Sequence, residues 1–267
     1  MRPLVLGILN VTPDSFSDGG RYASLDAAVA RAEEMLVEGA DWIDVGGEST
    51  RPGAAPVDAA TERDRVVPVI EALAGRCRIS VDTRRRPVAE AAVAVGATLI
   101  NDISASLYPV AAEAGVGWLA MHMQGEPATM QLRPSYRDVV AEVLAFLTAR
   151  AEAALEAGVE ELWIDPGFGF GKTLAHNLDL LAAIDRFVAT GFPVAIGTSR
   201  KGMCGALLAE SDGADEAVPL DDRLEGSVAT ATWAMAHGVR MVRAHDVKAT
   251  RQAATVVAGT PEPVGGR

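Results

Sequence analysis

Residues Leu162 to Thr173 read LWIDPGFGFGKT. They contain one copy of the pattern, an apolar run followed by a polar loop, whose repetition along the chain decides the fold. The stretch begins with a short apolar run, Leu162 to Ile164, of the kind that a fully buried strand shows. The run ends at Asp165, and the glycine-rich segment from Pro166 to Lys172 predicts a loop. A carboxylate at the carboxyl end of a buried strand, followed by such a loop, indicates a candidate functional site.

The same loop matches only part of a phosphate-binding P-loop. Gly171-Lys172-Thr173 resembles the end of that motif, but Pro166 stands where the motif requires its first glycine. A P-loop NTPase is therefore the least favoured interpretation of the function of this chain. Lys172 is expected to be a loop or helix-start residue rather than a phosphate ligand.

Short apolar runs followed by longer helical patterns recur along the whole chain. Strands are expected at residues 4–9, 42–45, 78–81, 98–100, 118–121, 162–164, 193–196 and 239–242. Helices are expected at about 25–38 (with Ser24 as N-cap), 58–74, 87–95, 136–157, 175–189 and 247–258, and on both sides of an acidic loop at 210–222. Eight such units predict a parallel sheet closed into a single (β/α)₈ TIM barrel, an α/β fold, rather than an open doubly wound sheet.

Length and composition support one domain, expected at residues 1–258, with a flexible tail at 259–267 that is rich in proline and glycine. The net charge of −12 argues against nucleic acid or an anionic membrane surface as a partner. Two cysteines, and no stretch that reads as a signal peptide or a membrane span, predict a soluble cytoplasmic protein.

Polar side chains follow nearly every expected strand, at the end where a barrel of this kind builds its active site. They are Asn10, Glu48 to Arg51, Asp82, Asn101, Asp102, His122, Asp165, Ser199 to Lys201, Arg243 and His245. Each alone reads more simply as a helix cap, a turn residue or a solvated side chain. Because they all fall at one end of one barrel, they predict a ligand site together.

These side chains also differ in what they can bind. The carboxylates and amide of Asp82, Asn101 and Asp165 can accept or donate hydrogen bonds along the edge of an aminopyrimidine-like ring. Four others are cationic or proton-donating and suit a phosphate or pyrophosphate: Arg51, Lys201, Arg243 and His245. The expected ligand is a polar bicyclic molecule that carries an anionic group.

Eight motifs resemble, in order along the chain, the signatures of the dihydropteroate synthase family, a family of pterin-binding TIM barrels. They are GILNVTPDSFSDGG at residues 7–20, DVGGESTRPG at 44–53, SVDT at 80–83, NDIS at 101–104, MHMQG at 121–125, DPGFGFGK at 165–172, SRK at 199–201 and RAHDV at 243–247. Any one motif is weak evidence, whereas the ordered series is highly specific.

The resemblance implies a transferase of folate biosynthesis, a sulfonamide target, that joins 6-hydroxymethyl-7,8-dihydropterin pyrophosphate to p-aminobenzoate. It implies that the pterin is contacted by Asp82, Asn101, Asp165, Lys201 and Arg243, with Asp82, Lys201 and Arg243 as catalytic residues. The pyrophosphate is expected at Asn10, Arg51, Arg243 and His245, with Mg²⁺ bound near Asn10.

The resemblance further places p-aminobenzoate against Thr50, Arg51, Pro52, Phe170, Ser199 and Lys201, with Phe16 and Asp18 closing over it. A homodimer through the later helices is expected on the same grounds. Arg84-Arg85-Arg86 departs from the family's more mixed sequence, and we interpret it as a solvated helix start.

Two further functions stay open besides the NTPase. One is a methyltetrahydrofolate-dependent methyltransferase domain of the same barrel group, which the anion-binding Ser-Arg-Lys and Arg-x-His motifs disfavour. The other is a non-catalytic protein that binds a pterin or a partner. Since all of the pterin-contacting residues are present, an inactive relative is disfavoured.

Overall fold

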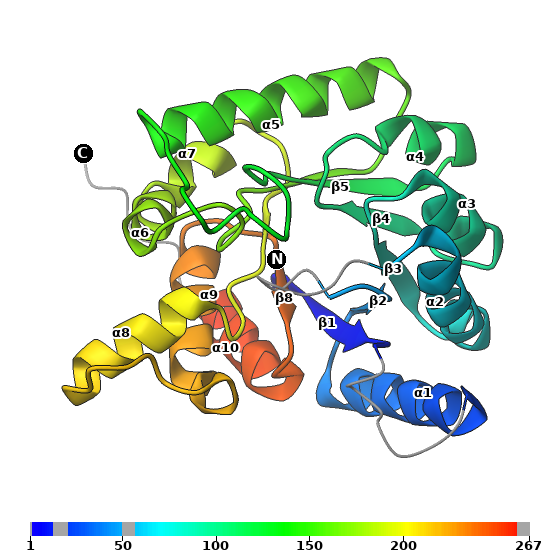
Figure 1. Ribbon diagram of the computed structural model, residues 1–267, viewed down its shortest axis with the longest axis horizontal. Helices are drawn as coiled ribbons and strands as arrows, with labels where there is room; N and C mark the ends of the chain where they lie inside the picture. Colours follow the sequence, from blue (N-terminus) through cyan, green and yellow to red (C-terminus); the bar gives the residue numbers. More distant parts are fainter. Residues whose placement is uncertain (1, 13–20, 50–56, 261–267) are drawn as a thin grey trace.

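The computed structural model describes residues 2–12, 21–49 and 57–260. Strands and helices alternate along these residues (Figure 1). The strands are β1 (Leu4–Asn10), β2 (Trp42–Gly46), β3 (Arg78–Asp82), β4 (Leu99–Asp102), β5 (Gly117–Met121), β6 (Leu162–Asp165), β7 (Ala195–Ile196) and β8 (Met241–Ala244). The helices are α1 (Arg21–Glu38), α2 (Ala59–Leu73), α3 (Arg86–Ala94), α4 (Tyr108–Ala114), α5 (Val139–Glu156), α6 (Leu174–Ala182), α7 (Ile184–Val188), α8 (Gly202–Asp212), α9 (Leu224–Ala236) and α10 (Val247–Gly259), with a 3₁₀ turn at Leu220–Asp222.

The eight strands form one closed parallel sheet. Their order is β6-β5-β4-β3-β2-β1-β8-β7. The outer strands of this order are joined by a parallel bridge between Ile164 and Val194 and by a 3.0 Å hydrogen bond from the Ile164 amide to the Pro193 carbonyl. The helices lie around the outside of the strands (Figure 1). The expected (β/α)₈ barrel is therefore confirmed.

Helix α4 is a helix that the sequence pattern did not predict. It has only seven residues, with Pro109 in its first turn and Gly115 in the left-handed conformation directly after its end. Two turns are too few for an apolar periodicity to be recognised. The helix expected at 175–189 is in fact two helices, α6 and α7, which meet at Ala183.

Several other boundaries differ from expectation, among them those of α1 and β8. Helix α1 begins at Arg21, so Ser24 lies inside it rather than at its N-cap. The capping preference of serine is a weak local signal, and the residues before Ser24 continue the helix. Strand β8 covers 241–244 instead of 239–242, since the apolar Val239 is buried without belonging to the strand. Arg243 consequently lies within a strand and not in the loop after it.

Two hydrophobic clusters divide the core. The larger cluster fills the space between the outer face of the sheet and the helices. The smaller one lies inside the barrel, where the rings of Trp42 and Trp163 meet edge to face with centroids 6.0 Å apart. Large side chains that project from several strands therefore close the barrel interior, as is usual for this fold.

A polar layer follows the apolar layer inside the barrel. Because alternate residues of a strand share a face, the residues two positions beyond the inward-facing Trp42, Leu99, Trp163 and Met241 face inward as well. These next residues are Asp44, Asn101, Asp165 and Arg243. The pleat of the strands thus places four polar side chains near the carboxyl end of the barrel.

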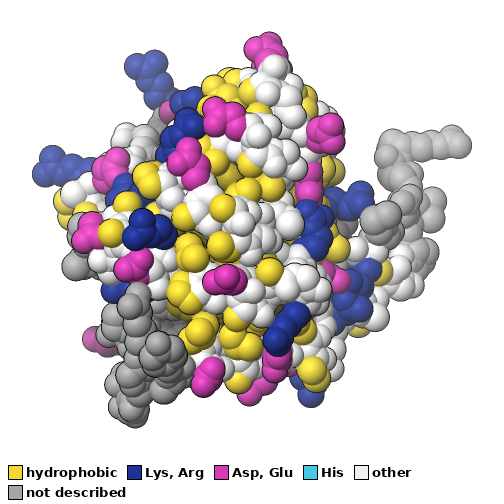
Figure 2. All heavy atoms as spheres, turned by 90° about the vertical axis from the view of Figure 1, so that its right-hand side faces the viewer, with side chains coloured by type: hydrophobic (Ala, Val, Ile, Leu, Met, Phe, Trp, Pro, Cys, Tyr) yellow, Lys and Arg dark blue, Asp and Glu magenta, His cyan; other side chains and the backbone are white. Residues whose placement is uncertain are grey.

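The outer surface carries charges of both signs. The face in Figure 2, which includes the right-hand side of Figure 1, shows acidic and basic side chains interspersed with apolar atoms. Exposed ion pairs link Arg76, in the turn after α2, with Glu33 on α1, and Arg86 on α3 with Glu113 on α4. In the part of the chain that the structure describes, no helix is long and apolar enough to cross a membrane.

Candidate active site

A cavity of about 660 Å³ opens at the carboxyl ends of the strands. Its wall is built from the loops that follow several strands, so residues far apart in the sequence meet there. Seven of the residues that were assigned a substrate or metal contact line it: Asn10, Asp82, Phe170, Ser199, Lys201, Arg243 and His245. The expectation that the strand ends converge on one cavity is therefore met for these residues.

Arg243 joins three strands at the bottom of the cavity. Its Nε donates to Asp44 Oδ2 and its Nη2 to Asp82 Oδ2, both at 2.5 Å. Asn101 Nδ2 also donates to Asp44 Oδ2, at 3.2 Å. The guanidinium is therefore held in a fixed plane by two carboxylates, a geometry suited to stacking over a flat ring.

Asp44 is a site residue that the sequence interpretation missed. It has no exposed surface, yet it connects Arg243 with Asn101. The available signal was a single charged residue within the otherwise apolar run Trp42 to Val45, since a buried charge requires a partner.

Burial raises the pKa of the carboxyl groups near the cavity floor. The pKa of Asp82 is raised well above its ordinary range by burial and by the Asp44 carboxylate, although Arg243 opposes the shift. Burial likewise raises the pKa of Asp165 to about 6, against the effect of the Gly167 amide, which donates to Asp165 Oδ1 at 2.7 Å. Both groups therefore change charge near neutral pH instead of near pH 4.

Lys201 lies against the aromatic ring of Phe170. Its Nζ is 3.8 Å from the ring centroid, a cation–π distance. Burial, together with the charge of Arg243, lowers the pKa of Lys201 to about 8, while Asp165 and Asp82 oppose the shift. The polar ammonium of Lys201 and the apolar ring of Phe170 therefore lie next to each other in the cavity wall.

Ser199 and His245 connect the loops after β7 and β8. Ser199 Oγ lies 3.0 Å from His245 Nδ1, and the His245 amide donates to Ser199 Oγ at 3.1 Å. This pair forms the wall next to Lys201, with a hydroxyl and an imidazole able to donate to an anion.

The other predicted residues fall into two groups. Asn101 and Asp165 are buried and are not among the cavity-lining side chains, so they lie beneath the surface of its floor. The predictions for Phe16, Asp18, Thr50, Arg51 and Pro52 lie outside the described residues.

Lys172 organises the loop after β6. Its Nζ donates to the carbonyls of Gly167 at 2.9 Å and Phe170 at 3.0 Å, and lies 3.0 Å from Nδ1 of His122. Burial lowers the pKa of Lys172 to about 7 and that of His122 to about 3. The ammonium thus bonds to its own loop, in agreement with a loop residue rather than a phosphate ligand.

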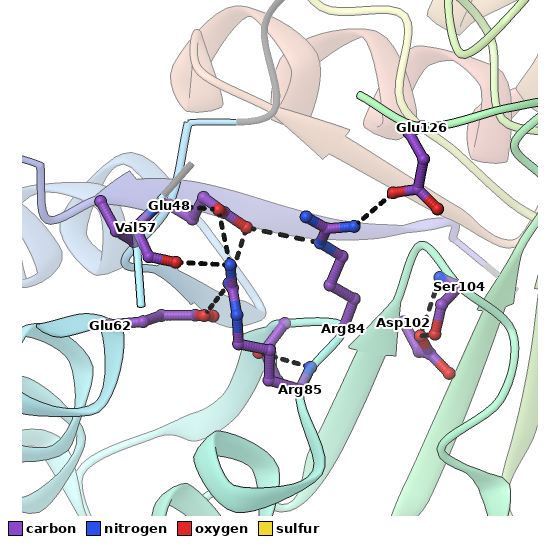
Figure 3. Close-up of polar contacts among 9 residues, drawn as sticks. Glu48, Val57, Glu62, Arg84, Arg85, Asp102, Ser104 and Glu126 are labelled. Atoms are coloured by element: carbon purple, nitrogen blue, oxygen red, sulfur yellow. Dashed lines mark hydrogen bonds and ion pairs between the residues drawn. The ribbon is translucent and has the colours of Figure 1, made fainter. Parts of the chain in front are cut away.

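The interpretation of Arg84-Arg85-Arg86 as a solvated helix start is wrong for two of the three residues. Arg85 contacts the buried Glu48 and Glu62, and Arg84 pairs with Glu126 at 2.6 Å (Figure 3). Only Arg86 is a surface residue, with ion pairs to partners on the outside of the helices. The difference arises because these carboxylates are distant in sequence, so a local pattern carries no sign of them.

Comparisons with known proteins agree with this geometry. A family model described as "Pterin binding enzyme" matches residues 6–245. The dihydropteroate synthase of Haemophilus influenzae is 48% identical over 256 residues, which cover 93% of this chain and 90% of that protein.

Two solved structures of the Xanthomonas albilineans dihydropteroate synthase are also similar. The structure with 4-aminobenzoic acid has a TM-score of 0.88 and 45% identity, and covers 97% of this chain and 94% of that chain. The complex with 7,8-dihydropteroate has a TM-score of 0.84 and 42% identity, and covers 97% of this chain and 95% of that chain. Since the family model spans most of the chain and the relatives match nearly all of it, the chain belongs to the dihydropteroate synthase family of pterin-binding enzymes.

Proposed function

We propose that this chain condenses 6-hydroxymethyl-7,8-dihydropterin pyrophosphate with p-aminobenzoate to form 7,8-dihydropteroate and pyrophosphate. The observation that carries the proposal is the composition of one cavity, in which Asp82 and Arg243 form the floor while Lys201, Ser199 and His245 form an adjoining wall. Such a cavity offers acceptors to the ring N–H groups of a pterin and donors to its anionic group.

The pterin is proposed to lie on the floor of the cavity. Asp165 Oδ1 already accepts the Gly167 amide, which fixes the carboxylate so that its other oxygen can accept a ring donor. Asp82 and Asn101 supply further polar groups, and Lys201 a donor. Arg243, held between Asp44 and Asp82, would stack over the ring.

The leaving group is proposed to lie toward Asn10, Arg51, Arg243 and His245. Asn10 lines the cavity, and its Oδ1 lies 3.7 Å from the place where a Cβ would stand on Gly46. An amide oxygen is a ligand that Mg²⁺ accepts, with phosphate oxygens completing its shell, so Asn10 fits a bound Mg²⁺. When bound, Mg²⁺ would neutralise charge on the departing pyrophosphate.

Bond breaking is proposed to precede bond making. The bond from the pterin methylene to the pyrophosphate oxygen breaks, and the oxygen keeps the electron pair. The resulting cation is stabilised by the pterin ring and by the carboxylates beneath it. The amino nitrogen of p-aminobenzoate then forms the new C–N bond and loses a proton, so no strong general base is required.

The second substrate is proposed to bind between Phe170, Lys201 and Ser199. The Phe170 ring offers apolar surface to the benzoate ring, and the Lys201 ammonium lies 3.8 Å from the centroid of the Phe170 ring. Thr50, Arg51, Pro52, Phe16 and Asp18 are proposed to complete this pocket, in agreement with their positions in the first two loops of the chain.

Pyrophosphate release tests the proposal. Purified protein with both substrates and Mg²⁺ should release one pyrophosphate for each dihydropteroate formed, and release should depend on p-aminobenzoate. A protein that binds a pterin in calorimetry but forms no dihydropteroate would instead be a non-catalytic binding protein.

Assembly and location belong to the same proposal. We propose a homodimer through the later helices, supported by the exposed apolar Trp233 on α9 and Val256 on α10. One domain at residues 1–258 is proposed because the eight strands belong to one sheet and each is followed by at least one helix in the described residues. A cytoplasmic location agrees with the two free cysteines, Cys77 and Cys204.

A further inference from the structure

The loop after β7 turns sharply at Arg200, between Ser199 and Lys201, which both line the cavity. The Lys201 amide donates to the Thr198 carbonyl at 3.1 Å and closes the turn. Arg200 has a φ of +56°, in the left-handed region that is unfavourable for a residue with a side chain. Such a conformation persists only where the surrounding structure holds it. The contacts that hold Arg200 come from two separate elements.

Helix α9 holds the backbone of Arg200. The Arg200 amide donates to Ser227 Oγ at 2.8 Å, and Arg223 Nη1 donates to the Arg200 carbonyl at 3.1 Å. Arg223 directly precedes α9, and Ser227 lies near the start of the helix. Neither contact involves the Arg200 side chain. The turn, with Ser199 and Lys201 on its two sides, is therefore fixed from α9 without the guanidinium.

The guanidinium of Arg200 contacts a different loop. Its Nε and Nη2 donate to the two carboxylate oxygens of Asp246 at 3.0 and 2.6 Å, a bidentate contact. Asp246 is the N-cap of α10, a position where an aspartate usually accepts an amide of its own helix, but its side chain makes no such bond. The Asp246 carboxylate therefore serves the contact with Arg200 rather than the start of α10.

This ion pair lies next to His245, the residue before Asp246. Ser199 Oγ lies 3.0 Å from His245 Nδ1 and accepts the His245 amide at 3.1 Å. Two consecutive residues of the loop after β7 thus contact two consecutive residues of the loop after β8. Since His245 lines the cavity, its place in the wall depends on both contacts.

Asp246 lies behind the cavity wall. Arg200 and His245 line the cavity, and they also line a second, smaller hollow of about 280 Å³. Among the described residues, Asp246 lines the second hollow and not the cavity. A ligand in the cavity can therefore contact Arg200 or His245 directly, whereas Asp246 acts on it only through them.

We propose that Arg200 is a positioning residue for the pyrophosphate group of the pterin substrate, acting through Asp246 on His245. The inference rests on the proposed function, which assigns His245 to the pyrophosphate, and deepens it. Loss of the guanidinium removes an anchor of the loop after β8. It leaves Ser199 and Lys201 in place, because α9 holds the backbone of the turn between them. Pyrophosphate binding should therefore weaken while p-aminobenzoate binding is kept.

Kinetics of variants at both ends of the ion pair test this role. Arg200→Met should raise the KM for the pterin pyrophosphate roughly tenfold or more, as misplaced binding groups do, with the KM for p-aminobenzoate nearly unchanged. Arg200→Lys should have an intermediate effect, because one ammonium cannot reproduce the bidentate contact. Equal rises in the two KM values after Arg200→Met would overturn the proposal.

Asp246→Ala distinguishes positioning from a direct contact or a charge effect. It should raise the KM for the pterin pyrophosphate as Arg200→Met does, and the double variant should be no worse than either single one, since each removes the same link. If Arg200 instead attracts the pyrophosphate directly, Asp246→Ala should leave this KM unchanged or lower it, because it removes a negative charge. Either of these outcomes would overturn the proposal.

Arg2 supplies a matched control at the other end of the barrel. It precedes β1, and its Nη1 and Nη2 pair with Asp41 at 3.0 and 2.5 Å, also a bidentate contact. The two side chains are 23% and 19% exposed, against 33% and 22% for Arg200 and Asp246. Arg2→Met should lower the melting temperature by a similar amount and leave both KM values close to those of the unchanged protein.

Binding of inorganic pyrophosphate separates this inference from the proposed function. If the unchanged protein forms no dihydropteroate, the proposed function fails. Calorimetry with pyrophosphate and Mg²⁺ needs no turnover, and it compares Arg200→Met and Asp246→Ala with Arg2→Met. Weaker pyrophosphate binding in the first two variants alone supports the positioning role. Unchanged binding in those two variants, or no pyrophosphate binding by the unchanged protein, contradicts it.

Discussion

Asp44 shows how a single buried charge determines the geometry of a ligand site. Its Oδ2 accepts hydrogen bonds from both Arg243 and Asn101, while Oδ1 is buried without a hydrogen-bond partner in the described part of the chain. An isolated buried carboxylate is unfavourable, and the Arg243 guanidinium compensates for it.

Asp44→Asn should weaken pterin binding about tenfold and destabilise the fold by about 1–3 kcal/mol, because a charged hydrogen bond to Arg243 becomes a neutral one. Calorimetry with a pterin and chemical unfolding measure the two effects. Asp179→Asn, a change at an exposed aspartate on α6, serves as the control. Unchanged pterin affinity in a folded Asp44 variant would remove the role assigned to Arg243.

The pKa of Asp165 predicts how pterin binding depends on pH. Burial raises this pKa to about 6, and only the ionised carboxylate accepts two N–H donors. Affinity should therefore be full above that pH and fall roughly tenfold for each pH unit below it. Asp165→Asn should bind weakly at all pH values and lose this part of the dependence.

Calorimetric titrations across this range make the comparison. Asp82, whose pKa is also raised, still titrates in the Asp165→Asn variant. The difference between the two profiles therefore isolates Asp165. Identical pH profiles for the variant and the unchanged protein would show that Asp165 does not bind the pterin ring.

At the scale of elements, the loop after β6 is held by its own backbone. Lys172 Nζ donates hydrogen bonds to the carbonyls of Gly167 and Phe170, and Tyr136 Oη donates to the Gly171 carbonyl at 3.0 Å. In a P-loop, by contrast, the backbone N–H groups and the lysine surround a phosphate. Through these contacts Lys172 holds the loop in the shape in which Gly169 and Phe170 line the cavity.

Gly167 allows this loop to turn against the strand next to it. Its φ is +70°, and a Cβ there would lie 1.9 Å from the His122 carbonyl oxygen. Gly167→Ala should destabilise the protein by about 3 kcal/mol or more, from backbone strain and displacement of β5 together. Denaturant unfolding measures the loss.

Gly115→Ala is the matched control for this prediction. Gly115 has a similar φ of +66°, but nothing lies within 4 Å of an added Cβ. Only the left-handed conformation is penalised there, by about 1–2 kcal/mol. Equal losses in the two variants would show that the contact with His122 is unimportant.

At the scale of the molecule, the proposed homodimer depends on an exposed face of α9. Trp233 is 49% exposed and stacks on His237 with ring centroids 4.4 Å apart, and Ala229 and Ala236 lie on the same exposed side of the helix. A large exposed aromatic ring among small residues is typical of an interface.

Trp233→Glu should shift the protein from dimer to monomer, since it introduces a charge at the centre of this face. Sedimentation velocity measures the change. Val37→Glu on α1, at a residue that is 90% exposed, should leave the assembly unaltered. A Trp233 variant that stays dimeric would move the proposed interface to another surface.

Much of the fold could be predicted from local patterns. The apolar runs predicted eight strands, and Asp58, expected at the start of the second helix, is its N-cap with its side chain accepting the Thr61 amide. Helix α4 escaped prediction because seven residues show no periodicity, and β8 was displaced because burial of Val239 resembles strand burial.

The site was predicted less completely. Motifs identified the residue types at the strand ends, including Asn10, Asp82 and Lys201, which line one cavity. Asp44 begins one of these motifs but was given no role, and Arg85 was assigned to solvent. Both errors concern partners that are distant in sequence, since Arg85 lies 37 positions from Glu48 and Arg243 lies 199 positions from Asp44.

The sequence by itself therefore determined the alternation of strands and helices, the closure expected of eight units, and the polar residues at the strand ends. These features depend on neighbouring residues, whose periodicity and turn preferences are local properties. Only the tertiary structure decided which charges compensate each other: Arg243 with Asp44 and Asp82, Arg85 with Glu48 and Glu62, and Lys172 with its own loop. The physical reason is that a buried charge takes its partner from whatever the closed barrel brings within hydrogen-bond distance, and barrel closure is a property of the whole chain.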